Sequence, residues 1–428
     1  MILELKIKNF LSFKDEVTFS FEATKDKSFE DYQVVEVAPG IRILRLAIVY
    51  GANASGKSNL LKAFEFLGHF WFDIPENKDE KTGIIPFLLN KKTPKEASEF
   101  SLVFFIGSTK HLYSLIIDET KIVTEKLYIY PGTQPALIFE RKLNGNISEI
   151  VFNAKKVKVS QAAKDEITVK CLANMSVFAA YNQVNVAIPE IENVIQWMKA
   201  QYMQSLGPDT YLIYNAEKES SHNKTIKEYI LNFLRRADYN ITNINAEEIE
   251  ESVPEEMLSL MLSKVGDISG EEKERLKRDR TIKLTKTEFE HRILNSDGIA
   301  EFYRLPKGLQ SDGTLRTFGL SGVIREVVEK NAFLAIDEIE SSLHPRLVEF
   351  IIEDFFKQKG QSQMLLTTHY DGLLEEDDLL RKDSIWFTNK NESGSSELYS
   401  LADFKGVNRM SSLQKAYKYG KFGAIPNI

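Results

Sequence analysis

The sequence predicts an α/β fold in which a buried parallel sheet is joined by an antiparallel β-layer and an inserted helical segment. Apolar runs of strand length occupy residues 44–50, 331–336 and 363–367, and helical patterns follow the first two. Short strand-like runs broken by glycines recur over residues 100–152, whereas helical spacing dominates residues 189–286. Continuous apolar strands that alternate with helices are typical of a parallel sheet covered on both faces.

The first apolar strand leads directly into a phosphate-binding motif. Residues 51–58 read Gly-Ala-Asn-Ala-Ser-Gly-Lys-Ser and fit G-x-x-x-x-G-K-[ST]. The glycines allow backbone N–H groups to turn toward an anion, and a helix predicted at residues 57–67 directs its positive end at the phosphates. We expect Lys57 to reach the β and γ phosphates of ATP and Ser58 to bind Mg²⁺. The nucleotide-binding residues predicted here are Gly51, Asn53, Ser55, Gly56, Lys57, Ser58 and Asn59.

The second apolar strand ends in two carboxylates, Asp337 and Glu338. In a parallel sheet this position lies at the carboxyl edge, where ligands bind. Asp337 is predicted to hold Mg²⁺, and Glu338 to polarise the water that attacks the γ-phosphate. A core strand that ends in a solvated acidic turn would give the same letters, but the upstream phosphate loop favours the catalytic interpretation.

The third apolar strand ends at His369. The spacing from Glu338 accommodates one crossover helix, predicted at residues 345–359, as a βαβ unit requires. His369 is therefore predicted to lie at the same sheet edge and to act near the γ-phosphate. A histidine after a strand is commonly just a loop residue. The presence of the phosphate loop and the Asp-Glu pair in the same chain favours a functional role for His369.

In this order the motifs resemble the ABC-type ATPases of the SMC, RecF and OLD group. Residues 337–345, Asp-Glu-Ile-Glu-Ser-Ser-Leu-His-Pro, resemble the combined Walker B and D-loop of the group, with Ile339 in place of the usual proline. Residues 367–369, Thr-Thr-His, resemble its switch-histidine segment. Residues 3–13 resemble its first strand and N-F-x-S-F turn, which implies that Ser12 lies near the nucleotide.

The same resemblance implies a signature segment shortly before Walker B. The best match is Ser-Asp-Gly-Thr at residues 311–314, which opens an apolar helix over residues 317–328. In the group this segment touches the γ-phosphate held by the partner chain, so Ser311 and Gly313 are expected to act in trans. An ordinary helix N-cap would use the same residues.

The C-terminal residues 415–428 resemble the Y-x-x-G-[RK]-[FY]-G-A-[VI]-P ending of compact bacterial ATPases related to RloA and to AriA of the PARIS system. The resemblance implies that the effector, a nuclease or toxin, is a separate protein in phage defence. Residues 417–428 are too apolar for a free end and too rich in glycine for a stable helix throughout, so we expect this tail to dock on its own head or on a neighbouring protein.

The composition of the chain argues against several classes of protein. A net charge of −7 argues against a pervasively basic nucleic-acid binder, although a local basic groove remains compatible with it. Cys171 is the only cysteine, so one chain forms neither a disulfide framework nor a cysteine zinc site, and a cytoplasmic location is expected. No apolar run approaches the ~18 residues of a membrane span, and the first residues do not resemble a signal peptide.

The remaining segments complete the domain plan. The runs at residues 100–106, 112–118, 122–130, 137–143 and 149–152 predict the β-layer, with Asn144-Gly145 as a hairpin turn. Helices are predicted at residues 190–205, 221–238 and 254–262, and the acidic segment 246–280 is assigned to the helical insertion. Gln134 and Gln183 both remain candidates for a Gln loop. The predicted domains are 1–188, 189–300 and 301–428, the first and last being halves of one ABC-type head.

The sequence therefore predicts an ATPase that acts as an ATP-gated homodimer or higher homo-oligomer and controls a separate effector. Two alternatives remain. A DNA-binding repair clamp of the RecF kind would need a basic surface beside the insertion, where Arg235 and Arg236 are the candidates. An OLD-type nuclease would need a further acidic domain, for which fewer than sixty residues remain after His369.

Overall fold

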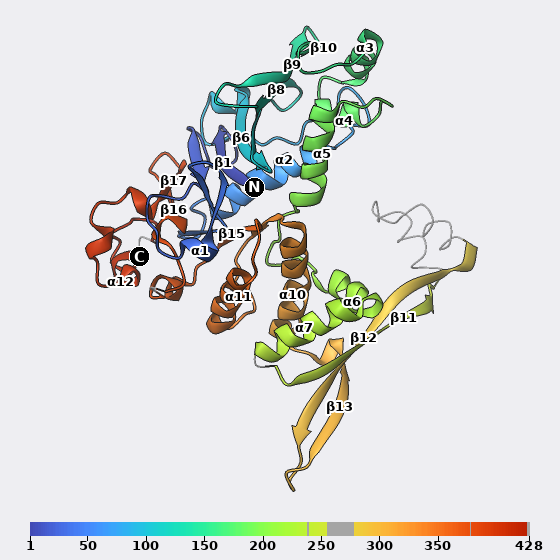
Figure 1. Ribbon diagram of the computed structural model, residues 1–428, viewed down its shortest axis with the longest axis vertical. Coiled ribbons are helices and arrows are strands. Elements are labelled where there is room, and N and C mark those ends of the chain that lie inside the picture. The colour runs from blue at the N-terminus through green and yellow to red at the C-terminus, as the bar shows by residue number, and fades with distance from the viewer. Residues whose placement is uncertain (238, 255–277, 377, 426–428) are drawn as a thin grey trace. The chain divides into compact units, whose positions relative to one another are not determined.

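The computed structural model describes residues 1–237, 239–254, 278–376 and 378–425 (Figure 1). They fall into two compact units. Unit 1 comprises Met1–Asp209, Glu326–Ser341 and Val348–Ile428, and unit 2 comprises Thr210–Arg325 and Ser342–Leu347. The domain boundaries expected after residues 188 and 300 stay a prediction.

A mostly parallel five-stranded sheet lies in unit 1 and confirms the predicted fold class. Its order is β14 (Phe333–Ile336), β15 (Gln363–Thr367), β5 (Leu46–Gly51), β16 (Ile385–Lys390) and β17 (Ser396–Ser400). The first four strands are parallel, and β17 returns antiparallel to β16. The three strands predicted from sequence are fully buried neighbours, so their carboxyl ends share one edge.

A seven-stranded antiparallel sheet forms the predicted β-layer of unit 1. Its order is β10 (Ile147–Phe152), β9 (Ala136–Asn144), β8 (Ile122–Tyr130), β7 (Thr109–Ile117), β6 (Ser98–Ile106), β1 (Ile2–Lys8) and β2 (Val17–Ser20). The hairpin predicted at Asn144-Gly145 is present, with Asn144 opposite Ile147 and a φ of 65° at Gly145. Two further strands, β3 (Val34–Ala38) and β4 (Ile41–Leu44), form a separate antiparallel pair.

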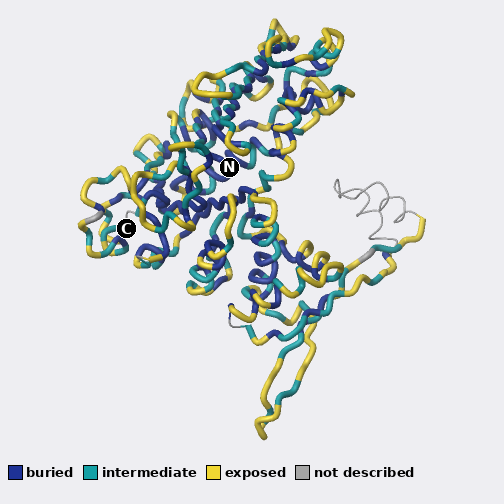
Figure 2. The backbone as a smooth tube through the Cα atoms, in the orientation of Figure 1, coloured by how far each residue is buried: buried dark blue, intermediate teal, exposed yellow. Residues whose placement is uncertain are grey.

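Helix α2 joins the two sheets of unit 1 through a common core. Leu60, Phe64 and Leu67 of α2 are fully buried and belong to the same apolar cluster as residues of β1, β6, β14 and β15. The buried stretches of the chain are dark blue in Figure 2. The phosphate loop is thus anchored on both sides by buried elements. The helices with residues in unit 1 are α1 (Glu30–Gln33), α2 (Lys57–Phe70), α3 (Gln161–Lys170), α4 (Val177–Tyr181), α5 (Pro189–Gln201), α10 (Asp312–Lys330), α11 (Pro345–Lys357) and α12 (Leu413–Lys418).

Unit 2 corrects the expectation of a wholly helical insertion. It contains α6 (Ile213–His222), α7 (Lys224–Arg236) and most of α10, but also a sheet of β11 (Ile241–Ser252), β12 (Thr281–Leu294) and β13 (Ala300–Pro306). Ile244, Phe289 and Phe318 pack in its core. The charges along β11 conceal its alternation, because that strand keeps only its first apolar residues buried. The helix predicted at residues 254–262 lies, apart from Pro254, outside the described residues.

Within the described residues, no helix combines the length and the apolar character needed to cross a membrane.

Candidate functional site

The phosphate loop, residues 51–58, connects β5 to α2. Gly56 is the N-cap of α2 and has a φ of 117°, a backbone conformation that residues other than glycine avoid. A Cβ on Gly51 would lie 2.4 Å from Ser55 Oγ and 2.6 Å from the Thr388 carbonyl oxygen. Both glycines of the motif are therefore required by local geometry as well as by the space a phosphate needs.

Lys57 is buried at the centre of the loop. Its Nζ donates to the carbonyl oxygens of Gly51, at 2.9 Å, and Ala52, at 3.2 Å. Burial lowers the pKa of Lys57, and the charges of Asp337 and Glu338 oppose that shift. An anion in the loop would likewise favour the charged amine, so phosphate binding and protonation of Lys57 reinforce each other.

A chain of side-chain hydrogen bonds fixes the far side of the loop. Asn59 Nδ2 donates to Ser12 Oγ at 2.7 Å, the hydroxyls of Ser12 and Ser396 lie 2.7 Å apart, and Ser396 Oγ donates to the Ser55 carbonyl oxygen at 2.6 Å. A carbonyl oxygen only accepts, so the single proton of Ser396 goes to Ser55, and Ser12 supplies the proton between the two hydroxyls. Ser12 is thus tied to the phosphate loop, and its place near a bound nucleotide stays a prediction from the resemblance.

The Walker B carboxylates are oriented by the neighbouring strand. Thr367 Oγ1 donates to Asp337 Oδ1 at 2.5 Å and accepts from the Glu338 backbone N–H at 2.8 Å. Glu338 has a φ of 46°, a left-handed conformation that is uncommon for a residue with a side chain and costs energy. The residue with this uncommon backbone conformation lines the cavity at the phosphate loop.

His369 faces Glu338 across the carboxyl edge. Its Nε2 lies 3.8 Å from Glu338 Oε1, and both side chains remain partly exposed. The His369 backbone N–H donates to Glu340 Oε1 at 2.5 Å. Glu340 therefore holds the backbone of the histidine, a role that the sequence did not indicate.

These residues surround a cavity of about 470 Å³ in unit 1. Its lining comprises Ser12, Asn53, Ala54, Ser55, Gly56, Lys57, Ser58, Asn59, Glu338, His369 and Lys390. Asp337 is not in the lining, although its charge acts on Lys57. Neither Gln134 nor Gln183 reaches this lining, so the Gln loop stays unassigned.

The predicted signature lies in unit 2 and is described by itself. Ser311 Oγ accepts from the Thr314 backbone N–H at 3.1 Å, which is the contact of a helix N-cap. A Cβ on Gly313 would lie 2.8 Å from the Ser342 carbonyl oxygen, so this position also needs glycine for packing. The action of Ser311 and Gly313 on a nucleotide stays a prediction. Arg235, considered for DNA contact, donates to the carbonyl oxygens of Ile241 and Thr242.

Sequence reasoning missed three residues beside the loop, all on the hairpin β16–β17. Thr388 Oγ1 lies 2.6 Å from Ser55 Oγ, Ser396 joins the chain described above, and Lys390 lines the cavity. The available signal was the apolar start of β16, Ile385-Trp386-Phe387, which reads as another core strand. The sequence did not reveal that this strand pairs with β5.

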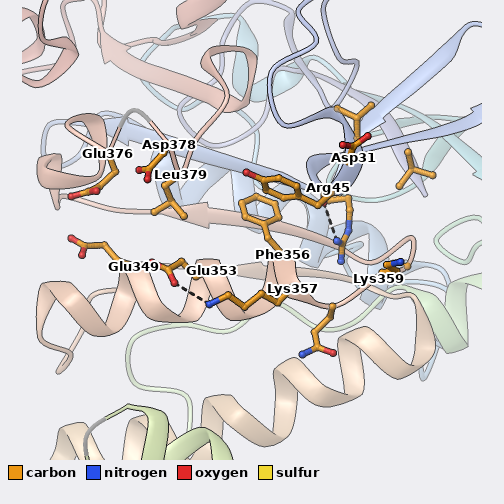
Figure 3. Close-up of a pocket in the computed structure, with 15 residues that line it drawn as sticks. Asp31, Arg45, Glu349, Glu353, Phe356, Lys357, Lys359, Glu376, Asp378 and Leu379 are labelled. Atoms are coloured by element: carbon orange, nitrogen blue, oxygen red, sulfur yellow. Dashed lines mark hydrogen bonds and ion pairs between the residues drawn. The ribbon is translucent and has the colours of Figure 1, made fainter.

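A second cavity in unit 1, of about 820 Å³, does not involve the phosphate loop (Figure 3). Residues of α1, β3 and α11 line it, and Glu349, Glu353, Glu376 and Asp378 lie toward one end (Figure 3). Arg45 lies at its other end, donates to the Tyr32 carbonyl oxygen at 3.1 Å and stacks over Phe355. These contacts give Arg45 a structural role, because they join the residue before β5 to helix α1.

A family model described as "AAA domain, putative AbiEii toxin, Type IV TA system" matches residues 46–155 and 213–375, together more than half of the chain. No curated protein matches the chain.

Three solved structures are similar at low identity. An SMC head domain from Thermotoga maritima is 13% identical, with a TM-score of 0.40, over 93% of this chain and 98% of that chain. An SMC head bound to the C-terminal winged-helix domain of ScpA is 14% identical, with a TM-score of 0.40, over 97% and 99%. An SMC head with an extended coiled coil, bound to the C-terminal domain of ScpA from Pyrococcus furiosus, is 13% identical, with a TM-score of 0.37, over 98% of each chain.

The matched family segments contain the phosphate loop, both Walker B carboxylates and His369, the residues that the structure brings to one sheet edge. The chain is therefore a P-loop ATPase that belongs to the family described as "AAA domain, putative AbiEii toxin, Type IV TA system".

Proposed function

We propose that this protein hydrolyses ATP as an ABC-type ATPase, works as a nucleotide-gated homodimer and controls a separate effector, a nuclease or toxin, in bacterial anti-phage defence. The observation that carries the catalytic part is the grouping of Lys57, Glu338 and His369 around one cavity. A buried cation, a carboxylate and an imidazole around a phosphate-sized loop form a constellation suited to γ-phosphate hydrolysis.

In this proposal each residue has a distinct task. Lys57 leaves the Gly51 and Ala52 carbonyl oxygens to bind the β and γ phosphates, and the backbone of residues 53–58 surrounds them. Glu338 accepts a hydrogen bond from the attacking water and polarises it, while His369 donates to the γ-phosphate. The donor set fits Mg²⁺, since Ser58 and Asp337 offer the hydroxyl and carboxylate oxygens that this ion prefers. When bound, Mg²⁺ would neutralise charge that develops on the phosphates.

The dimer rests on the resemblance of residues 311–314 to the group's signature. Lys57 and Ser311 would both contact the γ-phosphate, and the resemblance implies that they do so from different chains. Supplying the signature from a second chain would make each ATP a bridge between two copies, so hydrolysis would open the pair.

The link to toxin–antitoxin and defence systems has two independent supports. The family description names a putative toxin of a toxin–antitoxin system, and residues 415–428 resemble the ending of defence ATPases. The proposal that a separate protein carries the nuclease or toxin activity rests on the resemblance of residues 415–428 alone.

The decisive experiment is Glu338→Gln. The amide keeps the size and hydrogen bonding of the side chain but cannot polarise water as a carboxylate does, so turnover should fall about 100-fold or more while ATP binding is retained. Steady-state ATPase rates and equilibrium binding of labelled ATP measure the two quantities. Glu392→Gln, an exposed glutamate outside the cavity, serves as the matched control. Near wild-type turnover in Glu338→Gln would remove Glu338 from the mechanism.

A further inference from the structure

The described part of the C-terminal tail, residues 412–425, packs within unit 1 against β5, β16 and β17. Phe422 and Tyr417 stack on Phe387 of β16, with ring centroids 5.2 and 5.7 Å apart. Tyr417 also lies 5.8 Å from Tyr50, the residue that precedes the phosphate loop. Tyr399 donates to the Phe422 carbonyl oxygen at 2.7 Å. The tail therefore docks on its own head, one of the two outcomes expected from sequence.

The tail also contacts the loop that carries His369. Asp371 begins the 3-10 turn η3 (Asp371–Leu374), two residues after the histidine. Gln414 Nε2 of α12 donates to Asp371 Oδ1 at 3.1 Å, and Lys418 Nζ lies 3.4 Å from Asp371 Oδ2. The carboxylate of Asp371 is thus bound at both oxygens by successive turns of one helix.

The loop that carries His369 is also fixed by hydrogen bonds of His369 and Tyr370. Glu340 accepts from the His369 backbone N–H, and Thr368 Oγ1 accepts from the Tyr370 backbone N–H at 2.9 Å. Tyr370 Oη donates to Glu349 of α11 at 2.7 Å. Asp371, on the same loop, connects these contacts to Gln414 and Lys418 of α12. His369 is exposed, so its position relative to Glu338 depends on its backbone anchors more than on packing.

We propose that Asp371 is a positioning residue for ATP hydrolysis, through which the docked tail holds His369 against the γ-phosphate. The proposal rests on the ATPase function proposed above. A histidine displaced by about 1 Å loses much of its effect on the transition state, whereas the phosphate loop and ATP affinity are left intact. The tail is then part of the catalytic apparatus, and anything that lifts α12 would slow turnover without releasing nucleotide.

The first test is a split between kcat and KM. Asp371→Ala should lower kcat about 5- to 10-fold with KM for ATP unchanged, because only transition-state contacts are lost. The double variant Gln414→Ala with Lys418→Ala removes the same contact from the tail side and should behave alike. Lys415→Ala, an exposed lysine of the same helix, is the matched control and should keep wild-type values. Unchanged kcat in both test variants would overturn the proposal.

The second test asks whether Asp371 acts through His369. In a His369→Ala background, Asp371→Ala should cause no further loss of kcat, because the group it positions is gone. An equal fold-loss in both backgrounds would contradict positioning and indicate a merely structural effect.

A third measurement separates this inference from the proposed function. Hydrogen exchange of the backbone amides of residues 369–374 should speed up in Asp371→Ala and not in Lys415→Ala. If the wild-type chain hydrolyses no ATP, the proposed function fails, and unchanged exchange in Asp371→Ala would refute the tail contact by itself. If the wild type hydrolyses ATP and Asp371→Ala matches it, only the positioning role fails.

Discussion

Single residues around the phosphate loop are constrained by atoms that sequence motifs do not mention. Gly51 is usually explained by the turn, yet here it also leaves room for Thr388, which belongs to β16. Ser12 and Ser396 come from opposite ends of the chain and meet at Ser55. The conformation of the phosphate loop therefore depends on its tertiary contacts as well as on its own sequence.

The first residue-scale prediction is that Gly51→Ala destabilises the protein by about 1–3 kcal/mol, since the new methyl group would overlap a backbone oxygen that cannot move freely. ATP affinity should fall as well. Melting temperature and ATP binding measure both effects. Gly132→Ala, where a Cβ meets nothing within 4 Å, is the control. A Gly51→Ala protein that melts and binds ATP like the wild type would show that the loop can move away.

The second residue-scale prediction concerns the serine chain. Ser12→Ala and Ser396→Ala should each weaken ATP binding about 2- to 10-fold, the range expected for one lost hydrogen bond. The double variant should lose less than the product of the two, because both hydroxyls belong to one chain. Ser393→Ala alters an exposed hydroxyl of the same hairpin and should bind normally. Fully multiplicative losses would argue that the two serines act independently.

At the scale of elements, strand β8 carries a buried acid that ties the β-layer to α4. Glu125 accepts from Tyr113 Oη at 3.1 Å and from the Val177 backbone N–H at 2.9 Å. Burial raises the pKa of Glu125 to about 7, while Arg141 opposes that shift. At pH values between 4.5 and about 7 the acid is thus mostly protonated in the folded chain and mostly ionised in the unfolded chain.

This shift predicts how stability depends on pH. Between pH 4.5, the ordinary value, and about 7, the folded chain keeps a proton that the unfolded chain has released, so the free energy of unfolding falls as pH rises. The fall is on the order of 3 kcal/mol and levels off above pH 7. Melting temperatures of the wild type and Glu125→Gln from pH 5 to 8 measure it, and Glu149→Gln, on the exposed side of β10, is the control. The variant should lack this slope; parallel profiles would place the pKa of Glu125 near its ordinary value.

At the scale of the whole molecule, shared nucleotide sites predict complementation between inactive chains. Lys57→Ala and Ser311→Arg should each abolish ATPase activity alone, because every site then lacks either its loop or its signature. Mixed in equal amounts, they should recover about a quarter of the wild-type rate if subunits mix at random and interfaces act independently. No recovery, in mixtures shown by pull-down to form heterodimers, would contradict action in trans.

Sequence determined the parallel sheet, the β-layer and the phosphate loop, because these features depend on local patterns. Buried strands are continuously apolar, the β-layer strands are separated by turn residues, and the loop needs glycines in fixed positions. The order of the motifs also placed Lys57, Glu338 and His369 at one edge, since parallel strands end together. Each of these conclusions needed only residues that are near in sequence or repeated at a fixed period.

Tertiary structure alone decided the contacts between distant segments. Strand pairing and tail docking, which no local pattern encodes, produce three sets of contacts. These are the contacts of Thr388 and Ser396 with the phosphate loop, of Glu340 with the His369 backbone, and of α12 with Asp371. The same limit explains the error in unit 2, where strands β11 and β12 pair across 28 residues and their charges hide the alternation. Hydrogen bonds between remote side chains depend on where the backbone brings them, so only the folded chain reveals them.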